Sequence, residues 1–192
     1  IGTIATEYLM EHLETEKIGY VHMDEIPAMI AIHQNQVIEP VSIHYNKKHN
    51  LVLVHAINIG QNLGWKLAEM IEDLATQLSA KEIISLEGVG SPNADAGRVF
   101  YYSNKKLTKM DGVANPLQEG IIVGVTGALL ARNVKTPLLA LFAEARNGLP
   151  DSKAAAHIIE ALDSYTGLKI DPKPLMKQAQ VFEKKLKGLV QK

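Results

Sequence analysis

Apolar residues recur at helical spacing in four parts of the chain. A repeat of three to four residues places such side chains along one face of a helix. The spacing predicts helices over residues 3–15, 61–79, 152–166 and about 172–190. Asp151 precedes the third helix as a candidate N-cap, and Gly167 follows it at the position where a left-handed residue ends many helices. Asp171 and Pro172 form a cap and first-turn proline for the last helix.

Four short apolar runs rich in valine, isoleucine and leucine predict buried strands. They are Leu51–Ala56, Ile83–Leu86, Ile121–Val123 and Leu138–Ala143. Helices separate several of these runs, which is the pattern of a sheet covered on both faces. Residues 37–45 alternate and contain Pro40, which predicts an antiparallel or edge strand because proline cannot donate to a ladder. We therefore expect a single three-layer α/β domain over residues 1–192, with a mainly parallel or mixed sheet.

Composition narrows the classes of function. The 192 residues are enough to bury roughly 70% of the surface of the unfolded chain. The net charge of -1 predicts no general attraction to nucleic acid or to an anionic membrane. The chain has no cysteine, which excludes disulfides, thiolate metal sites and a cysteine nucleophile. No signal peptide is visible, and no apolar run reaches about 20 residues, so we expect a cytoplasmic protein.

Polar residues near the ends of predicted strands define a candidate pocket. The strand-end residues are Asn58, Glu87, Thr126 and Glu144. Open α/β sheets bind ligands at the carboxyl ends of their strands. Glu87 and Glu144 could serve as an acid/base pair or as ligands for a hard cation. An ion pair of Glu144 with Arg98 or Arg146 is the alternative, and the sequence leaves both open.

Two glycines of the same candidate pocket, Gly88 and Gly90, begin like a dinucleotide-binding fingerprint. The third glycine position is Asn93, and Pro92 lies inside the motif, so the fingerprint fails. We interpret Glu87–Ala96 as a loop that turns tightly after the strand.

Thr126 and Gly127 complete the pocket within Gly124-Val125-Thr126-Gly127, which follows an apolar run. Free backbone N–H groups at such a helix start can hold an anion, but the lysine of a phosphate-binding loop is missing. The favoured interpretation is structural: glycine allows close packing, and Thr126 caps the helix.

No residue is assigned a catalytic or metal-binding role. The seven histidines lack the local spacing of a zinc site, and there is no Gly-x-Ser-x-Gly elbow. His33, His44 and His55 lie on or near predicted strands and are interpreted as structural.

Residues 171–192 carry six lysines against two acidic residues. A solvated helix face accounts for such a run, since lysines near a helix C-terminus are favoured by the helix dipole. The functional alternative is a basic element, with Lys184, Lys185 and Lys187, that docks on an acidic partner.

Four segments, in this order, resemble the archaeal proteasome assembly chaperone family. They are Ala5-Thr6-Glu7-Tyr8-Leu9, Ser85-Leu86-Glu87-Gly88, Gly124–Leu130 and Pro150–Ala155. The resemblance covers nearly the whole chain and implies a phosphorylase/hydrolase-like α/β fold. It also implies a further strand before Ile1. Such proteins have also been described as related to the ATP-grasp superfamily, but the lysine and carboxylate pattern of that superfamily is absent here.

The resemblance implies a non-enzymatic, chaperone-like function without a cofactor. The expected partners are proteasome α-subunits or assembly intermediates, and a homo-oligomer is expected. Several family members bind α-subunits through a tail that ends hydrophobic-tyrosine-any residue. This chain ends Leu189-Val190-Gln191-Lys192, so the tail is either trimmed or not used. The alternative function is a small-molecule or nucleotide-binding enzyme or sensor that uses the candidate pocket.

Overall fold

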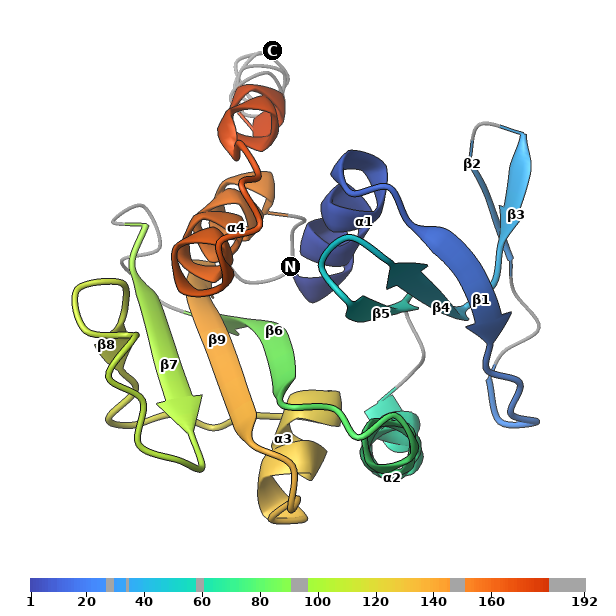
Figure 1. Ribbon diagram of the computed structural model, residues 1–192, viewed down its shortest axis with the longest axis horizontal. Helices are drawn as coiled ribbons and strands as arrows, with labels where there is room; N and C mark the ends of the chain where they lie inside the picture. The colour runs from blue at the N-terminus through green and yellow to red at the C-terminus, as the bar shows by residue number, and fades with distance from the viewer. Residues whose placement is uncertain (27–29, 34, 58–60, 91–96, 146–150, 180–192) are drawn as a thin grey trace, which may run out of the picture. The chain divides into compact units, whose positions relative to one another are not determined.

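The computed structural model describes residues 1–26, 30–33, 35–57, 61–90, 97–145 and 151–179 of an α/β protein (Figure 1). The chain divides into two compact units, which are described separately. The first unit comprises Ile1–Ala5, Ile84–Ile121 and Pro137–Lys192, and the second comprises Thr6–Ile83 and Ile122–Thr136.

An antiparallel sheet forms the centre of the second unit. Its strands are β1 (Glu16–Tyr20), β4 (Val41–Asn46) and β5 (Leu51–Ala56), in the order β1-β4-β5. Strand β4 is the middle strand, and alternation along it separates two chemically different faces. Val41, on one face, packs against Leu63 and Leu67. Ser42 and Asn46, on the other face, are polar and buried.

Helices lie on both faces of this sheet. The 3-10 helix η1 (Gln61–Leu63) and helix α2 (Gly64–Gln77) supply the apolar core around Val41. Helix α1 (Gly2–His12) contacts the polar face, where Thr6 bonds to His55 of β5. Helix α3 (Gly124–Ala131) packs against α2.

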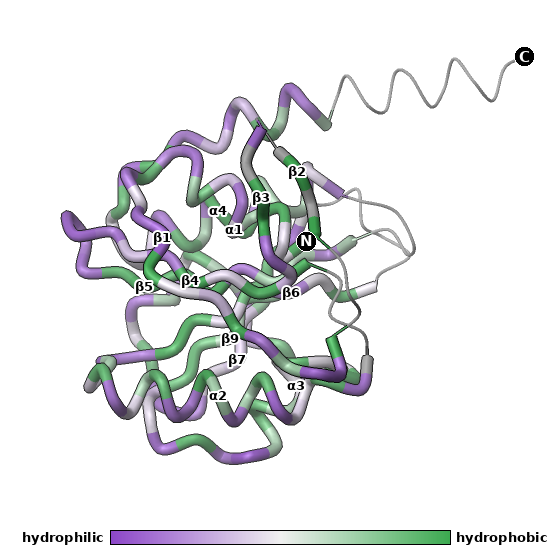
Figure 2. The backbone as a smooth tube through the Cα atoms, turned by 90° about the vertical axis from the view of Figure 1, so that its right-hand side faces the viewer, coloured by the Kyte–Doolittle hydropathy of each residue, from purple (hydrophilic) through white to green (hydrophobic). Residues whose placement is uncertain are grey.

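A separate hairpin in the second unit consists of β2 (Ala31–His33) and β3 (Gln36–Ile38). Its two strands are antiparallel, with Ile32 opposite Val37. Figure 2 shows that hydrophobic residues predominate along both strands.

The first unit is built around a mixed sheet. Its strands are β6 (Ile83–Gly90), β7 (Val99–Ser103), β8 (Asn115–Pro116) and β9 (Leu138–Ala145), in the order β6-β9-β7-β8. Strand β9 pairs with β7 antiparallel, while β7 pairs with β8 parallel. All eight residues of β9 are buried, as expected for an inner strand.

Helix α4 (Ser152–Thr166) packs on β9 and has the bounds and caps that its sequence predicts. The Asp151 carboxylate accepts from the Ala154 N–H at 2.8 Å. Gly167 ends the helix with a left-handed φ of 74°, which glycine adopts without strain. Residues 173–179 are helical, with Asp171 accepting from the Lys173 N–H; the remainder of the predicted last helix lies outside the described residues.

The α/β class is confirmed, but two local predictions are wrong. Residues 121–123 form no strand; Ile121 and Val123 are exposed, so apolar composition alone misidentified them. The predicted loop at Glu87 is part of β6, which continues to Gly90. Gly88 is suited to this strand because a Cβ there would lie 2.5 Å from Ile1 Cδ1.

Two further predictions need correction. Thr126 does not cap α3: the N-cap is Val123, without a side-chain hydrogen bond, and Thr126 is buried. The single strand predicted over residues 37–45 is divided at Glu39-Pro40 into the end of β3 and most of β4. Its antiparallel pairing is confirmed.

We predict that Gly127→Ala destabilises the protein although alanine favours helices by about 1 kcal/mol. A Cβ at Gly127 would lie 2.5 Å from the backbone carbonyl oxygen of Ile122. Such overpacking costs about 1–3 kcal/mol, which urea unfolding measures. Gly19→Ala is the matched control, because no atom lies within 4 Å of its added Cβ. Equal stability of both variants would contradict the prediction.

Candidate functional site

The residues of the predicted pocket belong to different elements. Glu87, Gly88 and Gly90 lie on β6 and Glu144 lies on β9, all in the first unit. Thr126 and Gly127 lie in α3 of the second unit. Asn58 lies outside the described residues, as do Lys184, Lys185 and Lys187 of the predicted docking element.

Glu144 is held in a bidentate ion pair with Arg98. The Arg98 Nε and Nη2 atoms donate to the two carboxylate oxygens at 2.9 and 2.7 Å. A backbone hydrogen bond holds the two residues side by side, because the Glu144 N–H donates to the Arg98 carbonyl oxygen at 3.1 Å. This bond lies beside the β7–β9 ladder, next to the pairing of Val99 with Ala143.

The pair lies at the boundary between core and solvent. The Glu144 side chain is 3% exposed, whereas that of Arg98 is 49% exposed. Hydrogen bonding to the carboxylate raises the pKa of Arg98 above its ordinary value. A carboxylate held at both oxygens by a guanidinium is poorly suited to act as a general base. The geometry therefore favours the ion-pair interpretation of Glu144 over the acid/base interpretation.

The Glu87 carboxylate makes a local contact. Its Oε1 atom accepts from the N–H of Gly88 at 3.3 Å. This hydrogen bond joins the carboxylate to the backbone of its own strand.

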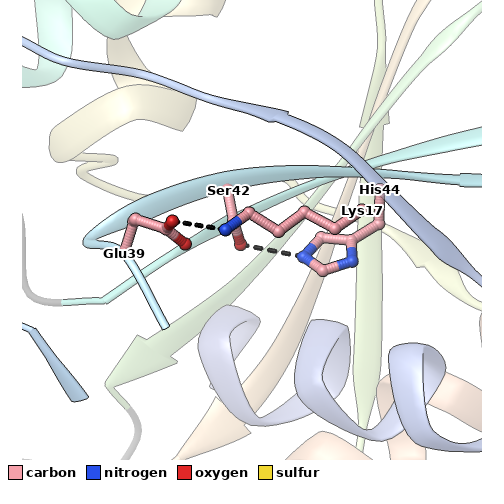
Figure 3. Close-up of polar contacts among 4 residues, drawn as sticks. All are labelled: Lys17, Glu39, Ser42 and His44. Carbon is pink, nitrogen blue, oxygen red and sulfur yellow. Dashed lines mark hydrogen bonds and ion pairs between the residues drawn. The ribbon is translucent and has the colours of Figure 1, made fainter. Parts of the chain in front are cut away.

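A polar cluster that the sequence analysis did not single out lies in the second unit. Figure 3 shows Lys17, Glu39, Ser42 and His44. The Ser42 hydroxyl bonds to the His44 Nε2 atom at 2.9 Å, and Lys17 forms an ion pair with Glu39. Lys17 lies opposite His44 in the β1–β4 pairing.

The spacing of two between Ser42 and His44 was a signal for this cluster. In a strand it places both side chains on one face. The alternation was visible in residues 37–45, but the pairing of Lys17 with Glu39 depends on contacts far apart in sequence.

Ser42 and His44 together resemble the nucleophile and base of a hydrolase, but access argues against that chemistry. Ser42 is 1% exposed, so a substrate cannot reach its hydroxyl without opening the sheet. Burial, with a smaller contribution from the charge of Lys17, lowers the pKa of His44. The hydrogen bond is therefore best explained as satisfying a buried hydroxyl.

His55 has a related environment on the neighbouring strand. Its Nδ1 atom lies 2.8 Å from the Thr6 hydroxyl of α1, and the residue is buried. Burial, and secondly the nearby His44, lower the pKa of His55 from 6.5 to about 4. The ring is neutral at pH 7 and joins the helix to the sheet within the second unit.

The described segments include a depression on the surface of the first unit. This depression of about 340 Å³ is lined mainly by the end of β7 and the following loop, from Tyr101 to Leu117, and includes no residue of the predicted pocket. Over the same segments, no three histidine or acidic side chains cluster so as to hold a metal. Nor does any helix within them combine the length and apolar character needed to cross a membrane.

Exposed apolar side chains are prominent in the second unit. Ile18 and Tyr20 of β1 are exposed, and so are Ile30, Ile32 and Val37 in and beside the hairpin. Ile32 and Val37 are neighbours, because they lie opposite each other in the hairpin. A contiguous exposed apolar patch indicates a protein-binding surface more often than a catalytic one.

Comparison with known proteins adds an independent finding. The family model described as PAC2 family matches residues 1–190. The uncharacterized protein MJ0106 of Methanocaldococcus jannaschii is 26% identical over 195 residues, which cover 100% of this chain and 81% of that protein.

Two solved structures from Pyrococcus furiosus are similar over most of their length. PbaA, described as an archaeal homolog of proteasome-assembly chaperone, has a TM-score of 0.86 and 26% identity, with 98% of this chain and 82% of PbaA covered. PbaB, described as an archaeal proteasome activator, has a TM-score of 0.81 at 21% identity, with 97% of this chain and 87% of PbaB covered. The second likeness concerns the fold alone.

We predict that Arg98→Ala lowers the free energy of unfolding by more than Arg132→Ala does, because Glu144 loses its bidentate partner while it stays buried. Urea unfolding measures the loss. Arg132→Ala is the control, since the Arg132–Glu72 pair is more evenly exposed and should contribute less than about 1 kcal/mol. Similar losses in both variants would contradict a special contribution of the Arg98–Glu144 pair.

We also predict that stability falls as the pH decreases from 6.5 to 4. Unfolded His55 binds a proton near pH 6.5, whereas the folded ring resists protonation until about pH 4. The unfolded state then binds more protons, which costs the fold up to roughly 3 kcal/mol. Urea unfolding across this range should show a flatter pH dependence in His55→Gln. His22→Gln, at an exposed position, should retain the wild-type slope; an unchanged slope in His55→Gln would refute the assignment.

Proposed function

Since the chain belongs to the PAC2 family, we propose that it is a chaperone-like protein that binds a proteasome-related partner. The observation that carries the proposal is the likeness of almost the whole chain to PbaA in both sequence and structure. Function in this proposal lies in surface recognition and requires no cofactor.

The geometry of the polar residues supports a binding function rather than catalysis. Glu144 is held by Arg98, and the Ser42 hydroxyl is buried. An enzyme that used Glu144 or Ser42 would need these groups open to solvent, and both are buried. Exposed apolar side chains in the second unit supply the kind of surface that a protein partner covers.

We propose that proteasome α-subunits or their assembly intermediates are bound in the cytoplasm. The lysine-rich segment with Lys184, Lys185 and Lys187 would accelerate association with an acidic surface. Opposite charges steer encounter at low salt, so this contribution should weaken as the ionic strength rises.

We predict a complex when the full chain is mixed with purified α-subunits at micromolar concentration and low salt, detected by native mass spectrometry. A triple variant with Lys184, Lys185 and Lys187 changed to glutamate should associate roughly tenfold more slowly, because like charges replace the steering charges. Association rates by surface plasmon resonance measure this difference.

Lys47→Glu with Lys48→Glu is the matched control, since both lysines are exposed in the turn between β4 and β5. It should associate at nearly the wild-type rate. Absence of any complex with wild-type protein would refute the proposed partner. Equal rates for both sets of variants would refute the role of the lysine-rich segment alone.

A further inference from the structure

The depression beside the end of β7 combines basic and apolar groups. Lys105 and Lys106 line it together with Tyr102, Leu107 and Leu117. Both lysines are exposed, and within the described part of the chain neither forms an ion pair. Positive charge beside apolar side chains suits a ligand that carries both negative charge and apolar groups.

Positive charge is concentrated in the loop that forms this wall of the depression. Residues 103–116 contain three lysines against one acidic residue, Asp111, although the whole chain has a net charge of -1. Lys109, the third lysine, lies over the ring of Tyr165, 5.9 Å from its centroid, and does not line the depression. The other two lysines therefore supply the charge that a ligand would meet.

The same loop is held in place by contacts within the first unit. The Asn104 side-chain oxygen accepts from the Leu138 N–H at 2.8 Å, and the Lys105 N–H donates to the Ser103 hydroxyl at 3.2 Å. Met110, further along the loop, is fully buried. A wall that is ordered before binding reduces the entropy cost of holding a ligand.

One backbone position in the depression has no strand beside it. The pairing of β7 with β8 ends at Tyr101, whose carbonyl oxygen accepts from the Leu117 N–H at 2.8 Å. The Asn104 N–H donates to the Leu138 carbonyl oxygen of β9. Peptide groups alternate between the two sides of a strand, so those of Ser103 face the same side as those of Tyr101. Among the described residues, no hydrogen bond is made by either backbone group of Ser103, which lines the depression.

We propose that this depression binds a short, extended, acidic segment of a partner protein. Acidic side chains of the segment would pair with Lys105 and Lys106, and apolar ones would contact Leu107 and Leu117. Its main chain would bond to Ser103, as when a peptide joins the open edge of a sheet. A volume of about 340 Å³ is at the small end of ligand sites, which favours a short segment over a folded surface.

A free phosphate or a nucleotide fits the depression less well. Lys105 and Lys106 are exposed, and exposed charges by themselves contribute little to binding. Asp111 also lines the depression, and its charge opposes a compact, multiply charged group more than a segment whose charges are spread apart. A peptide spreads its contacts over charged, apolar and backbone groups.

This inference goes beyond the proposed function, because it assigns a binding site to the loop after β7, apart from the lysine-rich segment over residues 171–192. Its test uses the full chain without any proteasome protein. Failure to bind the acidic peptide would leave a complex with α-subunits unaffected, and the converse also holds.

The test measures binding of a fluorescein-labelled peptide of eight residues, alternating glutamate and valine, by fluorescence anisotropy. Wild-type protein should bind it reversibly at low salt and more weakly as salt rises, and should not bind the peptide with lysine in place of glutamate. Lys105→Glu and Lys106→Glu should each weaken binding by at least about fivefold, because a like charge replaces an opposite one. Asp111→Asn should strengthen binding by about twofold, a gain that loss of folding cannot produce.

Two further peptides test the backbone contact with Ser103. Each keeps the glutamates but is N-methylated along one edge of its extended backbone, which removes the donors of that edge. One of them should bind at least about threefold more weakly than the other, because only one edge can face β7. Equal affinities would overturn the extended arrangement.

Lys109→Glu is the matched control, because it makes the same charge change in the same loop outside the depression. It should weaken binding by less than about twofold, as should the triple variant of Lys184, Lys185 and Lys187, and circular dichroism should show that all variants remain folded. Three results would overturn the proposal: no binding by wild-type protein, an equal loss in Lys109→Glu, or a loss confined to the triple variant. Displacement of the peptide by micromolar ATP would assign the depression to a phosphate ligand and would also overturn it.

Discussion

Polar side chains buried in an apolar core need partners, and this requirement determines the chemistry that they retain. An unpaired buried polar group costs about 1–3 kcal/mol, more than a typical hydrogen bond contributes. Glu144 meets the requirement through Arg98, and Ser42 and His55 meet it through His44 and Thr6. Groups that would be reactive in solvent are thereby committed to holding strands and helices together.

These pairings also order the two units internally. In the first unit, Arg98 and Glu144 meet beside the ladder between β7 and β9, so the ion pair and the backbone bond reinforce each other. In the second unit, the polar face of β4 and β5 is joined to α1, while the opposite face packs on α2. Each sheet thus depends on contacts between residues that are distant in sequence.

The surface has a different role from the interior. Charged residues and irregular pairing discourage the edge strand β1 from pairing with a strand of another chain. The hairpin combines neutral composition with exposed β-branched residues, a combination that favours contact with protein. Family membership and this surface together support recognition, whereas the buried polar groups support stability.

The sequence by itself determined the elements whose signals are local. The helix over Ser152–Thr166 was predictable because its apolar spacing, the Asp151 cap and Gly167 act within a few residues of one another. Leu51–Ala56 was predictable because a short apolar run that contains valine and leucine favours a strand. The family was predictable because several such signals recur in a fixed order.

Only the tertiary structure decided which residues meet. The run Ile121–Val123 has strand composition but forms no strand. The close approach of Ile1 to β6 leaves no space for a Cβ at Gly88. The choice of Arg98 as the partner of Glu144 depends on the pairing of β7 with β9. The spacing of residues determines which face of a helix or strand a side chain occupies. Burial and hydrogen bonding depend on elements brought together from distant parts of the chain.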